Sequence, residues 1–424
     1  MIRILLSSWA LLLGIGLLMM GNGLQATLMG MRGALDGFTT FELSIVTSAY
    51  FAGFLGGSKL APEMIRRVGH VRVFAALASL ISAALILFPV VSDPWFWTVL
   101  RVVIGFGFSG VYVTAESWLN NAATNENRGQ TLSAYMIIQM VGILTGQAIL
   151  ASGDPSGFVL FIMASVLVSV SFAPILLSVT PTPAFDSTKR MSIKELFHSS
   201  PLTFVSMIIL GGVFAASFGM GSVYASRIGL TLGQVSTFIS SIFIGSLLMQ
   251  YPIGWLSDRM DRRQLIFIVA LIGGVSAAVG FVGGTYFPML MVLGFCLGAT
   301  SNPLYSLLIA YLNDYLDTDD MAAASGGLVF INGLGAISGP VITGYLMDTV
   351  GPQGFWLFIS ALMLSIATYA LYRMTQRDAT SVADSGAYVN VMPTATPVAV
   401  EAAQEWVTDQ LEDVDNTPEV VWNQ

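Results

Sequence analysis

Long apolar stretches recur along the whole chain and are separated by short polar segments. Twelve of them approach the length of about 20 residues that an α-helix needs to cross a bilayer. They lie near residues 4–27, 42–61, 71–91, 95–118, 130–151, 157–179, 202–225, 234–256, 265–284, 288–312, 322–346 and 354–373. Lipid offers no partners for free backbone groups, and barrel strands would alternate and be about half as long. The pattern therefore predicts twelve transmembrane helices.

One long polar segment, from Thr180 to Ser200, divides these stretches six and six. The first stretch is too long for a signal-peptide core of about 7–15 residues and has no Ala-x-Ala-like cleavage site, so we expect it to be retained as a helix. The fold class is thus an all-α membrane protein. Its predicted parts are an N-terminal six-helix bundle (1–180), a cytoplasmic linker (181–201), a C-terminal six-helix bundle (202–375) and an acidic cytoplasmic tail (376–424).

Basic residues gather on one side of the predicted membrane. With the N-terminus inside, fourteen of the 17 Lys and Arg residues fall on the cytoplasmic side, as the positive-inside rule requires. The exceptions are Arg32 and Arg227, which fall outside, and Arg101, which lies within the fourth stretch. We therefore expect a multi-pass protein of the cell inner (plasma) membrane with both termini in the cytoplasm.

The net charge of −8 comes from the end of the chain. After Arg377 there is no Lys or Arg, and without the nine acids that follow, 17 basic and 16 acidic residues remain. Prolines and scattered acids predict a disordered, solvated tail. The alternative is that the amphipathic stretch from Ala399 to Val414 becomes helical against a partner.

Composition argues against several functions. Only 10% of the residues are charged, against roughly 25% in soluble proteins, and nothing is basic enough for nucleic acid. His70 and His198 are too far apart to suggest a metal site, and no phosphate-binding glycine loop with its lysine or hydrolase triad stands out. We expect neither an enzyme nor an ATP-driven pump, and no cofactor.

The two halves repeat each other at a constant offset of 193 residues. Six positions of the first half match six of the second at this spacing: Gly105, Tyr112, Leu119, Asn120, Gly142 and Gly146 fall on Gly298, Tyr305, Leu312, Asn313, Gly335 and Gly339. Duplicated six-helix halves are typical of transporters that rock about a site between the halves.

The segment Gly-Trp-Leu-Ser-Asp-Arg-Met-Asp-Arg-Arg (254–263) resembles the loop motif of the major facilitator superfamily (MFS). The resemblance implies that Gly254 allows close helix packing. It also implies that Asp258 and Arg262, beside Arg259, form an ion pair that holds one gate conformation, which we call a charge latch. The first-half copy keeps Gly57, Arg66 and Arg67, but has Pro62 and Glu63 near the expected aspartate. Its latch is therefore in doubt.

Longer runs narrow the resemblance to the bacterial YcaD-like transporters. They include Ser-Ala-Tyr-Phe-Ala-Gly-Phe-Leu-Gly-Gly (48–57), Ala-Glu-Ser-Trp-Leu-Asn (115–120) and Gln-Tyr-Pro-Ile-Gly-Trp-Leu-Ser-Asp (250–258). The resemblance covers roughly residues 5–375. It implies the twelve-helix MFS fold and an alternating-access secondary transporter, monomeric in the bilayer, with a small-molecule substrate and protons as one candidate coupling ion.

Two charged residues lie inside the predicted spans. Arg101 is about six residues into its helix, roughly 9 Å below the surface at 1.5 Å per residue. It either contacts substrate on the transport path or bonds backbone carbonyls. Glu116 lies near the cytoplasmic end of the same helix, where we expect it to pair with Arg66, Arg67 or Arg128 at a gate. Asp314, at a helix end, is expected to be solvated.

Neutral polar residues form the rest of the candidate cavity. In this family their helices line the cavity, and amides and phenols suit a neutral or aromatic ligand; the alternative is hydrogen bonding between helices. The set is Asn22, Gln25, Tyr135, Gln139, Gln147, Tyr224, Gln250, Asn302, Tyr305 and Asn332, with Gln139 and Gln250 ranked first.

Three functions stay open. The preferred one is uptake of a neutral or aromatic nutrient, for example a vitamin such as riboflavin. Drug or metabolite efflux by proton antiport is less favoured because no carboxylate lies at mid-bilayer, and because Gly142 to Gln147 lacks the Gly-Pro of many antiporters. The third is a non-transporting membrane sensor or scaffold that uses the tail.

Overall fold

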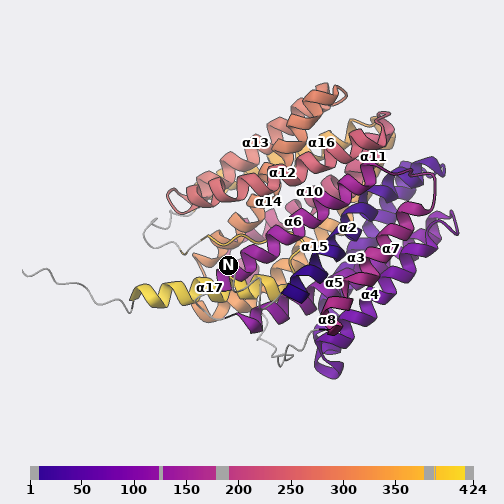
Figure 1. The fold of residues 1–424 in the computed structure, drawn as a ribbon. Helices are drawn as coiled ribbons and strands as arrows, with labels where there is room; N and C mark the ends of the chain where they lie inside the picture. Colours follow the sequence, from indigo (N-terminus) through magenta and orange to yellow (C-terminus); the bar gives the residue numbers. More distant parts are fainter. Residues whose placement is uncertain (1–8, 124–127, 178–190, 377–385, 387, 416–424) are drawn as a thin grey trace, which may run out of the picture.

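The computed structural model describes residues 9–123, 128–177, 191–376, 386 and 388–415. Every regular element in these ranges is a helix (Figure 1). The elements are α2 (Trp9–Leu35), α3 (Thr40–Val68), α4 (His70–Leu87), α5 (Pro94–Ala122), α6 (Arg128–Ala151), α7 (Val159–Ser171), α8 (Ala173–Leu177), α9 (Ile193–Ser199), α10 (Pro201–Ala215), η1 (Ala216–Met220), α11 (Gly221–Arg227), α12 (Leu232–Ser257), α13 (Arg262–Gly283), α14 (Phe287–Asn313), α15 (Thr318–Thr349), α16 (Gly354–Met374) and α17 (Pro397–Asp415).

The predicted all-α fold is confirmed, and each apolar stretch corresponds to one long helical segment, here called a rod. Two rods are interrupted. The sixth changes from α7 to α8 at Phe172, and the seventh contains the π-helical turn η1 between α10 and α11. Residues 181–190 of the predicted linker lie outside the described residues, and its described part contains α9.

Eleven helical segments within the described ranges are long and apolar enough to cross a membrane. The rod that is not among them is α3, which has the length of a span but buries Thr40, Ser44, Thr47 and Ser48. This helix packs between α5 of its own half and α15 of the other half. Because protein covers α3 on two sides, it can carry polar residues that a lipid-facing helix could not.

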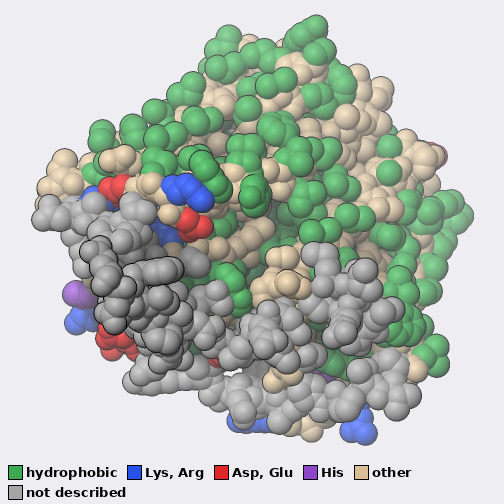
Figure 2. Space-filling model, turned by 60° about the vertical axis from the view of Figure 1, so that its left-hand side comes forward, with side chains coloured by type: hydrophobic (Ala, Val, Ile, Leu, Met, Phe, Trp, Pro, Cys, Tyr) green, Lys and Arg blue, Asp and Glu red, His purple; other side chains and the backbone are tan. Residues whose placement is uncertain are grey.

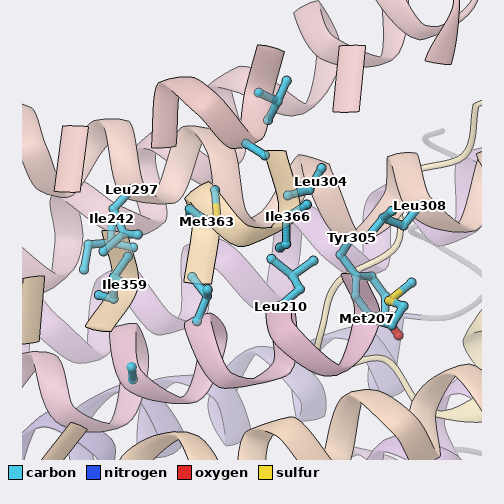
Figure 3. Close-up of a cluster of buried hydrophobic side chains, with 14 of the residues drawn as sticks. Met207, Leu210, Ile242, Leu297, Leu304, Tyr305, Leu308, Ile359, Met363 and Ile366 are labelled. Carbon is cyan, nitrogen blue, oxygen red and sulfur yellow. The ribbon is translucent and has the colours of Figure 1, made fainter. Parts of the chain in front are cut away.

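Each half has its own hydrophobic core. One cluster joins α2 to α8. The other joins α10 to α16, and it also includes Met31, Leu43 and Leu132 of the first half and tail residues such as Val400. Figure 3 shows part of the second core, where Leu210 of α10, Leu304 of α14 and Ile366 of α16 meet. The halves touch through α3 against α15 and α6 against α12.

Glycine lets helices within each half approach backbone to backbone, and it does so at equivalent places. A Cβ on Gly105 of α5 would lie 1.9 Å from the carbonyl oxygen of Tyr50, and one on Gly298 of α14 would lie 1.8 Å from that of Ile242. Both distances are far below contact, so no other residue fits without moving a helix. The repeat at 193 residues is therefore confirmed as a repeat of helix packing.

The surface is apolar over most of the visible face, and Figure 2 shows charged side chains gathered towards one end. We call this the basic end, because it carries Arg66, Arg67, Arg259, Arg262 and Arg263 at the ends of α3, α12 and α13. The opposite end, with Arg32 and Arg227, is called the outer end. The apolar face is the surface expected next to the hydrocarbon of a bilayer, and the charged ends are expected at its polar boundaries.

The tail differs from its prediction. Where the sequence predicted a disordered segment, the described tail residues up to Thr408 contact the bundle, and α17 begins at the basic end and extends beyond it (Figure 1). The helix contacts α5, α6 and α15. It buries the small apolar face of Val400, Ala402, Ala403 and Val407, which realises the alternative of a helix formed against a partner, with this bundle as that partner.

Replacing Gly298 with alanine should destabilise the protein by about 1–3 kcal/mol, the usual cost of overpacking. Gly326→Ala is the matched control, since a Cβ there meets no atom within 4 Å. That control should be neutral or gain up to about 1 kcal/mol from helix propensity. Melting temperatures in detergent measure both, and equal values would contradict the close-packing explanation.

Candidate substrate-binding cavity

A cavity of about 110 Å³ lies between the two halves. Its walls come from α2, α3, α5 and α6 of the first half and from α10, η1, α12, α14 and α15 of the second. At the basic end its wall is completed by the tail residues Met392, Pro393 and Thr394. The described lining residues are mostly apolar, and the polar ones are concentrated on the first half.

Arg101 is the one charged side chain among the described residues that line the cavity. It is 5% exposed, donates from Nη1 to Oε1 of Gln25 at 2.8 Å, and lies 4.6 Å from the centre of the Tyr50 ring. Its Nε has no hydrogen-bond partner among the described residues. A buried guanidinium is costly unless acceptors surround it, so this group is under-satisfied.

A chain of hydrogen bonds runs from Arg101 towards the basic end. Gln25 donates to Oδ1 of Asn22 at 3.0 Å, and Asn22 donates to the hydroxyl of Tyr112 at 2.9 Å. These partners come from α2 and α5, two helices of the same half. The network fixes the amide orientations and presents one polar wall to the cavity.

The second half presents an aromatic wall. Phe214 lies beside Phe218 with ring centroids 4.6 Å apart, and Phe218 beside Phe243 at 4.7 Å. Phe51 of α3 reaches across to Phe214 at 6.3 Å. A ligand in this cavity would thus meet a cation and amides on one side and ring faces on the other.

Two amides of the second half also reach the cavity. Asn302 donates to the Ser246 hydroxyl, while its own Oδ1 is buried without a partner in the part of the chain that the structure describes. Asn332 donates to the carbonyl of Met207 at 3.1 Å. The unpaired oxygen of Asn302 is an acceptor that a donor on a ligand could satisfy.

The structure places seven of the predicted polar residues on the cavity and four elsewhere. Those that line it are Arg101, Asn22, Gln25, Gln139, Gln147, Asn302 and Asn332. Gln250 is buried outside the cavity and accepts from Tyr388 at 2.8 Å; Tyr135 bonds Glu116; Tyr305 lies in the second core (Figure 3); and Tyr224 donates to the Gly284 carbonyl.

Sequence reasoning missed the cavity's aromatic residues and the tail. Tyr50 belongs to one of the runs that resemble the YcaD-like transporters, and Tyr112 is the repeat partner of Tyr305, so a signal for each was present. Nothing in the sequence pointed to Met392, Pro393 and Thr394, because only folding brings these tail residues to the cavity.

At the basic end Arg262 is the centre of a buried network. It is 2% exposed, pairs closely with Asp314, donates to Ser257 and Ala310, and lies 3.7 Å from Asp258. The expectation that Asp314 is solvated is wrong, since its side chain is 3% exposed. Burial raises the pKa of the Asp314 carboxyl, and Arg262 opposes that shift.

The neighbours in the loop motif have other contacts. Arg259 stacks on Trp255, with the guanidinium carbon 4.3 Å from the ring centre. Gly254 faces the ring of Tyr388, and a Cβ there would lie 2.6 Å from it. In the first half, Gly57 packs on the carbonyl of Phe106, while Arg66 and Arg67 both pair with Glu63. Glu63 thus replaces the expected aspartate.

Of the three partners expected for Glu116, Arg66 and Arg67 are wrong, because both pair with Glu63. Glu116 is 3% exposed, accepts from the Tyr135 hydroxyl at 3.1 Å, and accepts from both the backbone and the hydroxyl of Thr396. The side chain of Arg128 lies outside the described residues. The Glu116 carboxylate therefore contacts the tail, and Glu63 pairs with Arg66 and Arg67 in the last turn of α3.

Known proteins resemble the chain over most of its length. A sequence profile of the Major Facilitator Superfamily matches residues 11–240 and 203–394. The chain is 28% identical over 359 residues to the "Uncharacterized MFS-type transporter YcaD" of Escherichia fergusonii, which covers 83% of this chain and 92% of that protein. It is 24% identical over 356 residues to its namesake in Salmonella arizonae, with the same two shares.

Two solved structures share the fold. The nucleoside transporter NupG superposes with a TM-score of 0.73 at 15% identity, over 87% of this chain and 99% of that one. A bacterial homologue of the human lysosomal transporter Spinster, in an inward-facing and unoccupied conformation, gives 0.64 at 12% identity, over 94% and 97%.

Two six-helix halves around a central cavity, in an apolar exterior, define a multi-pass membrane transporter. The chain belongs to the Major Facilitator Superfamily, and among its relatives are the YcaD-type transporters.

Arg262→Ala should destabilise the protein by about 3–5 kcal/mol, because it leaves the buried Asp314 carboxylate uncompensated. Arg259→Ala removes the same side chain from the same loop, but only an exposed stacking contact of about 0.5–1 kcal/mol and an exposed hydrogen bond to the Trp255 carbonyl. Melting temperatures in detergent compare the two. Similar losses would show that Arg262 does not hold the network together.

Proposed function

We propose that this protein carries a small organic solute by alternating access, and that the solute combines a flat ring system with hydrogen-bond acceptors. The observation that carries the proposal is Arg101. Its buried guanidinium meets Gln25 and Tyr50, and no carboxylate lies among the described residues that line the cavity. A ligand oxygen beside Nε would supply the missing acceptor.

The aromatic wall supports the ring. Phe214, Phe218 and Phe243 offer faces and edges to which a planar heterocycle stacks, and such contacts add roughly 0.5–1.5 kcal/mol beyond area burial. A flavin such as riboflavin has this chemistry. So does a nucleoside, the class of solute for which the fold neighbour NupG is named.

We assign the basic end to the cytoplasm and favour uptake. The positive-inside rule gives the orientation. A cavity without a lining carboxylate in the described chain suits a neutral or weakly anionic nutrient better than a cationic drug. Protons are therefore not required inside the cavity itself.

Proton-coupled efflux is the second candidate, and Glu116 is the observation that favours it. A carboxylate that is 3% exposed, with hydroxyl and amide partners, has the surroundings of a proton carrier. Its place beyond the cavity, against the tail, makes this the weaker candidate.

A thermal-shift screen tests the substrate class. Flavins, nucleosides, sugars, amino acids and cationic drugs would be added to the purified full-length protein in detergent. A solute at about 100 times its dissociation constant stabilises by roughly 2.7 kcal/mol, and we expect this from flavins or nucleosides. Arg101→Ala and Gln139→Ala should abolish the shift, and Arg259→Ala should keep it. A shift from cationic drugs alone would contradict the proposal.

Direction has its own test in cells sensitised to toxic compounds. Expression of the protein should give no broad resistance if it works in uptake. Broad resistance that is lost in Glu116→Gln would overturn uptake and support proton-coupled efflux, since the amide has the carboxylate's shape but cannot take up and release a proton near neutral pH.

A further inference from the structure

The outer end of the cavity is closed by direct contact between the halves. Gly30 of α2 packs on Ser222 of α11, Gly219 of η1 on Thr47 of α3, and Gly344 of α15 on Ser44 of α3; a Cβ on any of these glycines would lie 2.2–2.6 Å from the opposing side chain. With the outer end closed in this way, the basic end is the side on which the cavity would open.

That opening is occupied by the tail. We call the space bounded by Glu116 and Tyr135 of the first half, and by Gln250 and Ser306 of the second, the mouth. Tail residues fill it: Val391, Met392, Ala395 and Thr396 are each no more than 6% exposed. The cavity left above them, at about 110 Å³, is smaller than the roughly 300–1,000 Å³ of typical ligand pockets.

The tail is bound to the second half by a series of specific hydrogen bonds. The Tyr388 backbone donates to Asp258 at 3.0 Å, and its hydroxyl donates to Gln250 at 2.8 Å. Ser306 accepts from the Val391 amide at 2.9 Å and donates to the Val391 carbonyl at 2.9 Å. A hydroxyl that bonds both polar groups of one residue fixes the register of the segment.

Further contacts extend this docking at both ends. Asp314 accepts from the Gly386 amide at 3.3 Å, and Arg262 donates to the Gly386 carbonyl. Gln404 of α17 donates to Asn313 at 3.1 Å. The buried network centred on Arg262 thus binds the tail backbone as well as the carboxylates of Asp258 and Asp314.

The first half holds the same segment from the other side. Glu116 accepts from the Thr396 amide at 3.2 Å and from its hydroxyl. Gly129, at the start of α6, lies against the indole of Trp406, and a Cβ there would be 3.0 Å from Nε1. The tail therefore bridges the two halves at the end where they would have to close on each other.

We propose that the mouth is a peptide-binding site whose ligand is the chain's own segment 388–407, and that this bound segment is an autoinhibitory plug. While it is bound, solute does not exchange between the cavity and the basic end, and the halves cannot close there. Transport requires the segment to leave. The effect on flux rests on the proposed transport function, whereas the occupancy of the mouth does not.

Occupancy can be measured without a substrate. In the full-length protein with Cys296→Ser, a reporter Gln139→Cys lies where the cavity meets the tail. A membrane-impermeant charged maleimide is added to vesicles that expose the basic end, which labelling of a separate Arg66→Cys variant identifies. We expect slow labelling of the reporter in the parent and labelling about tenfold faster in Thr396→Ala, because a hydrogen bond to a buried carboxylate is lost.

Thr408→Ala is the matched control, since within the described ranges its hydroxyl contacts only the Met321 sulfur at 3.9 Å and its own helix at 3.3 Å. Its labelling rate should equal the parent's. Tyr388→Ala, which removes the bond to Gln250 without touching Glu116, should act like Thr396→Ala.

The plug would be overturned if the reporter reacts as fast as Arg66→Cys in the parent, or if both tail variants leave its rate unchanged. Either result leaves the transport proposal standing, because labelling reports access alone. Conversely, fast labelling in the variants would keep the plug, and a ligand screen that fails in Thr396→Ala as well would reject the proposed substrate class.

Discussion

The structure depends on one constraint: a charge inside the bilayer has no water to solvate it, so protein or ligand must do so. Three of the buried charged side chains in the described part of the chain meet this constraint differently. Arg262 has Asp314, Glu116 has hydroxyl and amide donors from Tyr135 and Thr396, and Arg101 has only a neutral amide and a ring face. The Arg262–Asp314 pair is complete and structural. Glu116 relies on the tail segment that we propose can leave, and the incomplete environment of Arg101 marks the place where a solute is expected.

The sequence was sufficient for the fold because helix formation in lipid leaves few alternatives. Span lengths and the 193-residue repeat came directly from spacing, and Gly105 and Gly298 show why the spacing persists: each occupies a backbone contact that admits no side chain. The site was predicted only in part. Depth along a helix placed Arg101 and Gln139 well, but Gln250 and Tyr305 face other helices, and helix rotation is set by packing that apolar periodicity does not reveal.

The tail shows a different limit. Its acids and prolines resemble those of a solvated segment, and its apolar face from Val400 to Val407 is too small to fold alone. The surface that binds it is assembled from both halves, so the partner of this face does not exist until the bundle has formed. Composition predicts how a segment behaves in water, whereas this segment is folded against a concave protein surface.

The modest hydropathy of α3 has a consequence for biogenesis. A segment leaving the ribosome partitions into the bilayer according to its own apolar content, and serines and threonines weaken that tendency. The twenty-nine residues of α3 are therefore the span that enters lipid least readily by itself. Its most extensive partner in the first half is α5, whose Gly105 fits against it, so we expect α3 to be retained in the bilayer only once α4 and α5 have followed it.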